Sequence, residues 1–248
     1  EVLNIALGLG AQPIGHWSGC HAVLVDAEAP DVECAYEHRY SYPYGIMVDI
    51  NGKRFVDEGE DFFSYTYAKC GREVLRLPWR TAYQIFDSKT RPLLRSEYNR
   101  GFHVSADTIE ALAKKLPGLD WENVVETVAA FNDAVNDAPF DPSKHDGKCT
   151  QGISPVKSNW AQRLDTPPFY AFPVTCGITF TFGGIGITEK GEVKDTSENV
   201  ISGLFAAGEI TGGSFFNNYP GGSGLMKGAV FGRLAGTSAA DFAKAKRA

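Results

Sequence analysis

The sequence predicts a mixed α+β/α/β protein in which residues 30–165 are inserted between two pieces of another domain, 1–29 and 166–248. Two connections support this division: residues 28–43 and 139–168 are rich in proline and polar side chains, and neither has a helix or strand period. Helix and strand patterns alternate between them, whereas the chain after them runs through short apolar strands into one long helix. We therefore expect an interrupted domain that carries an α+β insert.

The first piece and the start of the insert have clear local signals. Residues 1–12 have the apolar pattern of a helix that ends at Gly8 or Gly10, because glycine readily adopts the left-handed cap conformation. Residues 44–56 predict a β-hairpin, since the Asn51-Gly52 pair is typical of a type I′ turn.

The rest of the insert combines helices with strands. Asp107 and Glu110 have the spacing of a capping box, which predicts a helix that ends before Pro117. A short apolar run predicts a strand at 81–86, and another predicts one at 21–26 in the first piece. An apolar stripe predicts a helix at 121–135, and a further helix is expected at 62–76.

The second piece is dominated by strand patterns and closes with a helix. A Lys190-Gly191 pair predicts a turn between two of its strands. We expect strands at 169–175, 178–181, 185–188 and 200–207, and a final helix at 222–244.

Composition excludes several classes of protein. The chain has 248 residues, 43% of them hydrophobic, and a net charge of −6, which argues against nucleic acid as a bulk partner. No apolar run approaches the roughly 20 residues that span a bilayer, and the start lacks the basic residues of a signal peptide. Five cysteines at wide spacing favour reduced thiols and no metal site. The sequence therefore predicts a cytoplasmic protein without metal.

The segment from Gly203 to Gly236 carries the chemistry. An apolar strand runs into Gly208-Glu209, a glycine-rich loop follows, and a helix then begins with GGSGL. Small residues let a ligand approach the backbone, and a helix start favours an anionic group such as the N1–C2=O edge of a reduced flavin. A glycine-rich turn that only packs a helix on a sheet is the alternative. The expected cofactor-binding residues are Ala207, Gly208, Glu209, Gly222, Ser223, Gly224 and Leu225, with Glu209 as acceptor for a ribose or polyol hydroxyl.

Several motifs follow one another in the order of one known family. They are GLFAAGE at 203–209, TGG at 211–213, GGSGL at 221–225, TFGGIGI at 181–187, a segment ending at His21, and the hairpin NGKRFVDE at 51–58. The chain resembles the fumarate reductase/succinate dehydrogenase flavoprotein family. This resemblance implies FAD, a Rossmann-like FAD-binding domain with an inserted capping domain, and hydride transfer between flavin N5 and a carbon beside a carbonyl.

The resemblance also implies that the chain is a C-terminal fragment. The family binds the ADP half of FAD through a GxGxxG fingerprint near its N-terminus, and Gly8-Leu9-Gly10 does not continue into one. Glu1 falls inside the amphipathic pattern, which a shortened chain of any origin would also give. We expect a missing N-terminal FAD-binding segment.

Two departures from the family concern the substrate. Tyr219 stands where fumarate reductases have a carboxylate-binding arginine, and Phe180 replaces a second substrate histidine. Tyr-Pro-Gly at this place resembles 3-ketosteroid dehydrogenases, in which that tyrosine polarises the ketone. The wider string CGITFTFGG and FNNYPGGSGL resembles tricarballylate dehydrogenases, which form cis-aconitate. The sequence thus predicts a small polycarboxylate substrate, with a fumarate reductase-like or 3-ketosteroid dehydrogenase-like reaction as the alternative.

The expected catalytic residues are Tyr219, His21 and Arg72. His21 matches the family's substrate histidine by resemblance, and a structural histidine is the alternative. The family's proton-donor arginine follows the hairpin, where this chain has Phe62-Phe63, so the next arginine, Arg72, is the candidate for the proton relay. Arg54 is expected to pair with an acidic neighbour in the hairpin.

Partners follow from these expectations. We expect a small carboxylate as substrate and a soluble or membrane protein as electron acceptor. The non-enzymatic alternative is a truncated chain that only binds a partner over its exposed flavin face.

Overall fold

The computed structural model describes residues 1–30 and 38–247. The chain forms two compact units, Glu1–His21 with Ile178–Ala248, and Ala22–Gly177. We call them the terminal unit and the inserted unit. Their boundaries fall within the strands β2 (Cys20–Asp26) and β6 (Phe169–Thr181), because both strands run on from one unit into the other. The expected boundaries at residues 29/30 and 165/166 lie inside the inserted unit, and the roles expected for the two domains stay predictions.

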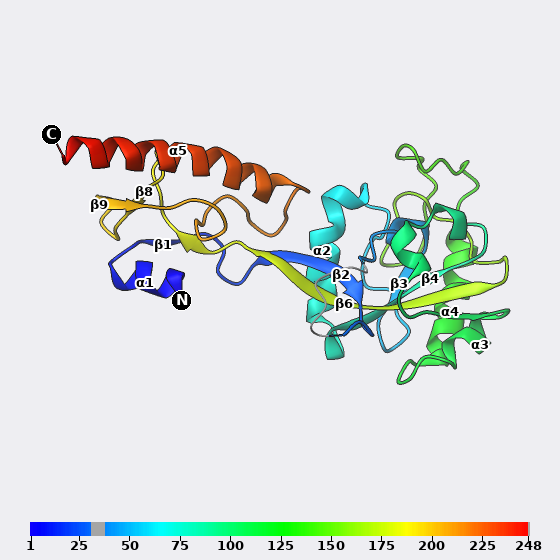
Figure 1. Ribbon diagram of the computed structural model, residues 1–248. Coiled ribbons are helices and arrows are strands. Elements are labelled where there is room, and N and C mark those ends of the chain that lie inside the picture. The colour runs from blue at the N-terminus through cyan, green and yellow to red at the C-terminus, as the bar shows by residue number, and fades with distance from the viewer. Residues whose placement is uncertain (31–37, 248) are drawn as a thin grey trace. The chain divides into compact units, whose positions relative to one another are not determined.

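The inserted unit is built on a five-stranded sheet (Figure 1). The strand order is β2-β6-β4-β3, with β4 at Thr81–Phe86 and β3 at Ile46–Val48, while β5 (Val104–Ala106) pairs with β6. The pairs of β6 with β4 and β5 and of β4 with β3 are antiparallel. The strands expected at 169–175 and 178–181 are thus parts of one longer strand, and β5 is an additional one.

Side chains alternate between the two faces of this sheet, as the pleat requires. Tyr83 and Ile85 belong to the main core, together with Leu112 and Phe131 from the helices α3 (Ile109–Ala113) and α4 (Trp121–Ala134). Phe86 instead packs with Leu94, Tyr98 and Phe172 in a second cluster. The helix α2 (Phe63–Arg76) confirms the helix expected at 62–76, and α4 that at 121–135.

Two local expectations in the inserted unit were wrong. The turn after β3 is not type I′: Gly52 has a φ of +71° but Asn51 does not have a positive φ. The Asp49 carboxylate holds this loop by accepting the backbone N–H groups of Asn51 and Lys53. The N-cap of α3 is Thr108, not Asp107, because the Thr108 hydroxyl accepts the Ala111 N–H at 3.1 Å.

The proline-rich connection at 139–168 is more ordered than a linker. Trp160 is 1% exposed, and its indole N–H donates to the carbonyls of Asp141 and Lys144. The buried Lys157 ammonium donates to the carbonyls of Pro43 and Gly45. This segment therefore forms part of the wall of the inserted unit. Of the other connection, at 28–43, residues 31–37 lie outside the described residues.

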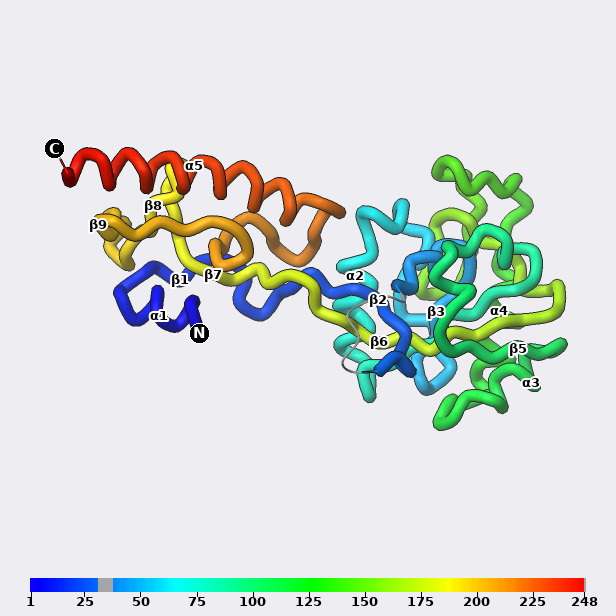
Figure 2. Tube along the Cα trace, in the orientation of Figure 1, coloured from blue at the N-terminus to red at the C-terminus, as the bar shows by residue number. Residues whose placement is uncertain are grey.

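The terminal unit contains two-stranded sheets together with the helices α1 (Val2–Gly8) and α5 (Ser223–Ala245), as Figure 2 shows. The helix α1 (Val2–Gly8) confirms the expected helix end at Gly8, and the Lys190-Gly191 turn is present, with a φ of +78° at Gly191. The strands pair as β1 (Pro13–Ile14) with β7 (Gly184–Ile185), and β8 (Glu192–Lys194) with β9 (Val200–Phe205). The strands expected at 185–188 and 200–207 are thus shorter than predicted.

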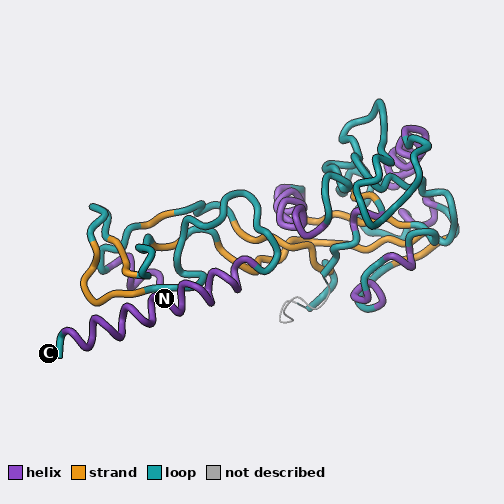
Figure 3. Tube along the Cα trace, turned by 90° about the horizontal axis from the view of Figure 1, so that it is seen from above, coloured by secondary structure: helices purple, strands orange, loops and turns teal. Residues whose placement is uncertain are grey.

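The long helix α5 (Ser223–Ala245) confirms the helix expected at 222–244. It runs beside β9 (Figure 3), and the rings of Phe242 and Phe205 meet at a centroid distance of 6.0 Å. One core cluster of this unit contains the buried residues Ala6, Ala11, Ile185 and Val193, and Phe182, Tyr219 and Ala235 are also buried. Within the described part of the chain, no helix is both long and apolar enough to span a membrane.

Candidate functional site

The glycine-rich loop after β9 is held in place by backbone hydrogen bonds. Ile185 of β7 donates its N–H to the carbonyl of Ile210 and accepts the N–H of Gly212. The Thr211 hydroxyl donates to the carbonyl of Gly208 at 2.8 Å. The loop is therefore fixed against β7, next to the start of α5.

The start of α5 has the features expected of a ligand-binding helix end. Gly222 is its N-cap and has a left-handed φ of +81°, which a residue with a Cβ rarely adopts. Leu225 and Met226, in the first turn, are 81% and 63% exposed. Ser223 donates its hydroxyl to the carbonyl of Pro220 at 2.5 Å, which fixes the approach to the helix. The helix start is thus preorganised and open on its outer side.

Tyr219 is anchored to this helix start. Its hydroxyl oxygen accepts the backbone N–H of Gly224 at 2.7 Å, and the residue is 5% exposed. A Cβ at position 224 would lie 2.4 Å from the Tyr219 hydroxyl and 2.9 Å from the Phe180 ring, so only glycine allows this approach. One of the amide groups that we expected to face the cofactor therefore binds Tyr219 instead.

His21 lies directly on Tyr219. Their rings stack with centroids 3.9 Å apart and an interplanar angle of 18°. The Thr179 hydroxyl lies 2.5 Å from His21 Nδ1 and 3.3 Å from the His21 carbonyl oxygen, which fixes the orientation of the imidazole. The structure therefore brings together two of the three expected catalytic residues.

Aromatic side chains surround the Tyr219 ring on its other sides. The rings of Phe180, Phe182 and Phe215 lie at centroid distances of 5.6, 6.4 and 4.7 Å from it. Phe180, which replaces the family's second substrate histidine, thus packs with the rings of Tyr219 and Phe215. The immediate neighbourhood of the tyrosine within the terminal unit is mainly aromatic.

Lys227 is a cation in this unit that sequence reasoning missed. Its ammonium donates to the carbonyl of Thr211 and lies 5.8 Å from the centre of the Phe180 ring. Burial lowers its pKa, and the Glu209 carboxylate acts in the opposite direction. The spacing from Gly224 gives a signal, because residues three apart share a helix face. Lys227 also lines a hollow of about 240 Å³ beside the glycine-rich loop.

Glu209 is already engaged through one of its oxygens. Its Oε1 accepts the Thr181 backbone N–H at 2.7 Å and the Thr181 hydroxyl at 3.1 Å. A ligand hydroxyl would therefore bind at Oε2, and the expected role in binding a ribose or polyol stays a prediction.

Arg72 belongs to the inserted unit. It lies in α2 and binds the Glu73 carboxylate through Nε and Nη2, at 3.2 and 3.1 Å. Its role in a proton relay stays a prediction. Arg54 pairs with Glu58 at 2.5 Å, which confirms the acidic partner expected in the hairpin. Among the residues that the structure describes, no group of three or more His, Cys, Asp or Glu side chains is arranged to hold a metal ion.

Comparisons with known proteins point to one family. The model of the FAD binding domain matches residues 33–225. NADH:acrylate oxidoreductase of Vibrio harveyi is 33% identical over 79% of this chain and 18% of its own length. Fumarate reductase (cytochrome) of Shewanella frigidimarina is 36% identical over 80% of the chain and 32% of its own length. 4-Oxocyclohexanecarboxylate 2-dehydrogenase of Sinomonas cyclohexanicum is 30% identical over 80% of the chain and 37% of its own length.

A solved structure agrees with these relatives. The open conformation of a flavocytochrome c3 fumarate reductase superposes with a TM-score of 0.69 at 26% identity, over 98% of this chain and 40% of that one. The chain thus spans well under half the length of the curated relatives named above.

Proposed function

The chain belongs to the FAD binding domain family, and from this premise we propose that it holds the flavin ring and a substrate carbonyl in an FAD-dependent oxidoreductase. The reaction that we propose is hydride transfer at the carbon–carbon bond beside that carbonyl. An FAD-binding segment N-terminal to this chain would hold the ADP half of the cofactor. A soluble or membrane protein would exchange electrons with it.

The residues at the start of α5 fit a flavin. Gly222 has nothing within 4 Å of its Cβ position, so a planar ring can approach the backbone there. The positive end of the α5 dipole favours the anionic edge of a reduced ring, and Lys227 adds a cation nearby. When bound, FAD supplies the hydride acceptor or donor at N5.

One observation carries the proposal: the Tyr219 hydroxyl accepts the Gly224 N–H at 2.7 Å. That bond occupies a lone pair of the oxygen and leaves the O–H to donate to a ligand. The bond also places the oxygen at the positive end of α5, which polarises the O–H and strengthens it as a donor. A substrate carbonyl bound there would be activated for desaturation or reduction of the neighbouring bond.

The aromatic surroundings of Tyr219 favour a ketone as the activated group. Apolar walls suit the carbon skeleton of a ketone and strengthen a hydrogen bond to its oxygen. The Sinomonas relative is named for such a compound, 4-oxocyclohexanecarboxylate. His21, stacked on Tyr219, would orient the substrate and share the hydrogen bond to its carbonyl.

A tricarballylate-like polycarboxylate, desaturated to a cis-aconitate-like product, is the second candidate. Lys227 offers a cationic group and His21 a ring nitrogen in the same unit as Tyr219, and the relatives named for acrylate and fumarate act on carboxylates. Arg72 would then serve as the proton relay. A fragment that only binds a partner chain is the non-enzymatic alternative.

The test is flavin reduction followed by stopped-flow absorbance. The flavoprotein that contains this chain is mixed with 4-oxocyclohexanecarboxylate, a 3-ketosteroid, tricarballylate, succinate and citrate. Bleaching by 4-oxocyclohexanecarboxylate or the 3-ketosteroid, but not by tricarballylate, succinate or citrate, supports the first candidate. Bleaching by tricarballylate supports the second. Y219F should slow bleaching by about 10²-fold. Full-rate bleaching in Y219F would contradict the role of the tyrosine, and a preparation without flavin bands would favour the non-enzymatic alternative.

A further inference from the structure

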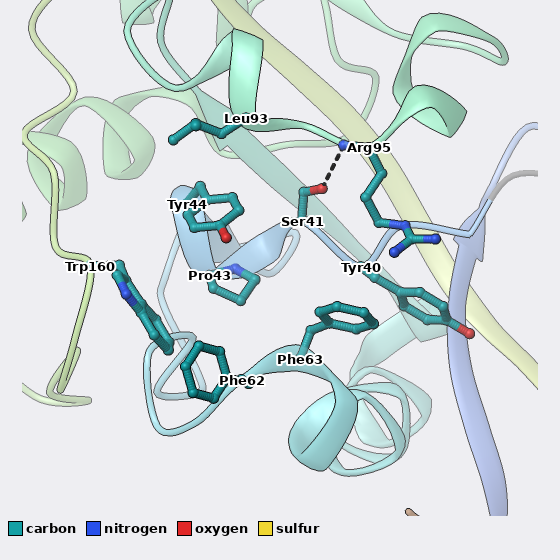
Figure 4. Close-up of a pocket in the computed structure, with 9 residues that line it drawn as sticks. All are labelled: Tyr40, Ser41, Pro43, Tyr44, Phe62, Phe63, Leu93, Arg95 and Trp160. Carbon is teal, nitrogen blue, oxygen red and sulfur yellow. Dashed lines mark hydrogen bonds between the residues drawn. The ribbon is translucent and has the colours of Figure 1, made fainter. Parts of the chain in front are cut away.

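The inserted unit contains a second site that the proposed reaction does not use. It is a pocket of about 110 Å³ between the segment at 40–44, the start of α2 and the wall formed by the proline-rich connection (Figure 4). Phe62 and Phe63, which stand where the family has its proton-donor arginine, both line it. We call it the aromatic pocket.

The two ends of the aromatic pocket differ in character (Figure 4). Tyr44, Phe62 and Trp160 line one end, and the rings of Phe62 and Trp160 meet at a centroid distance of 5.3 Å. Trp160 presents its ring face there, because its indole N–H is bonded to backbone carbonyls away from the pocket. This end is therefore an apolar wall for a flat or branched hydrocarbon group.

The other end carries a positive charge. Arg95 extends beside Tyr40 and Phe63, with its guanidinium carbon 5.3 Å from the centre of the Phe63 ring. The Arg95 backbone N–H donates to the Ser41 hydroxyl at 3.1 Å, which fixes the base of the side chain. Glu97 binds the guanidinium through Nε and Nη2, at 3.2 and 3.1 Å. Within the described part of the chain, Nη1 is left as the group that a ligand anion would meet.

Size and charge together define a ligand. An apolar cavity of about 150 Å³ holds benzene in another protein, so the pocket of about 110 Å³ takes one ring at most, with part of the ring and its substituent in the open mouth. Guanidinium groups bind carboxylates through charge-assisted hydrogen bonds. We propose that the aromatic pocket binds a small monocyclic carboxylate, with its ring against Tyr44, Phe62 and Trp160 and its carboxylate on Arg95.

Ligand titrations of the 248-residue chain followed by saturation-transfer NMR and tryptophan fluorescence test this proposal. The probes are benzoate, the uncharged analogue benzamide, and acetate, which lacks the ring. We expect benzoate to bind about tenfold more tightly than either analogue, since both the ring and the charge contribute. Equal binding of benzoate and benzamide, or no binding of benzoate, would overturn the proposal.

Variants locate the binding. R95L should weaken benzoate about tenfold, R95K should weaken it less, and E97Q should strengthen it by removing the competing carboxylate. L93W should fill the pocket and abolish binding. R76L is the matched control, because Arg76 forms a similar pair with Glu73 and does not line the pocket. Circular dichroism verifies that each variant is folded, and a benzoate affinity that R95L and L93W leave unchanged contradicts the assignment.

Discussion

At the residue scale, Gly224 controls where Tyr219 lies. Position 224 has no room for a Cβ, whereas a Cβ at Gly228, one turn further along α5, would have no other atom within 4 Å. We predict that G224A displaces the Tyr219 ring and destabilises the terminal unit by about 1–3 kcal/mol, and slows flavin bleaching as Y219F does.

The matched change G228A gives the control. It removes a helix-interior glycine without a clash, so the free energy of unfolding should rise by about 0.5–1 kcal/mol. Chemical denaturation of both variants checks this contrast, and equal effects would show that Gly224 has no steric role.

Sequence reasoning found Tyr219 and His21 but not how they are held. Both were identified by their place in family motifs, and the ring stack that joins them depends on strand pairing between residues far apart in the chain. The Gly224–Tyr219 hydrogen bond could not be predicted for a different reason. A glycine-rich helix start indicates that backbone N–H groups are accessible, but not which group accepts their hydrogen bonds. Lys227 was missed because a lysine in a helix is ordinarily a solvated side chain.

At the element scale, α3 shows how one cap residue sets a helix start. Thr108 accepts the Ala111 N–H, whereas the sequence pattern favoured Asp107. We predict that T108A lowers the free energy of unfolding by about 1 kcal/mol and that D107A changes it by less than about 0.5 kcal/mol. Urea denaturation measures both changes. A larger loss of stability in D107A than in T108A would show that Asp107, and not Thr108, caps the helix.

The elements that sequence predicted best are those with a strong period of their own. α2, α4, α5 and β4 lie within two residues or so of their expected bounds, since an apolar stripe or alternation determines them locally. The sequence predicted two strands in place of β6 because Cys176-Gly177 interrupts the apolar pattern. Only pairing with the neighbouring strands keeps these residues in one continuous strand. β1, β5 and β8 are too short for a period to be recognised.

At the scale of the whole molecule, buried ionisable groups make stability depend on pH. Burial raises the pKa of the Cys70 thiol from 9.0 to about 12. Above pH 9 the unfolded chain loses this proton while the folded chain keeps it, so the thiol's contribution is complete below pH 9 and falls as pH rises towards 12. We predict a shallower alkaline loss of stability in C70A, measured by urea denaturation from pH 8 to 11. A slope identical to that of the parent chain would contradict the prediction.

Lys157 makes stability depend on pH in the opposite direction. Burial lowers its pKa from 10.5 to about 8, against the raising effect of Glu58. Between these values the unfolded chain binds a proton that the folded chain does not, so stability from this group rises with pH across the interval and falls towards pH 8. K157M should therefore be less stable relative to the parent chain at pH 10 than at pH 7.5. An unchanged difference between the two pH values would contradict the predicted shift.

The unequal cores of the two units have a consequence for the life of the protein in a cell. The main core cluster of the inserted unit is larger than the cluster that Ala6, Ala11, Ile185 and Val193 form in the terminal unit. Under the proposed function, FAD binds the folded form of this unit and therefore adds to its stability as the free cofactor concentration rises above the dissociation constant. When the chain is synthesised faster than FAD is supplied, some copies lack the cofactor. Proteases would cleave the terminal unit of these copies before the inserted unit. The supply of FAD in the cell would then set the abundance of this protein as well as its activity.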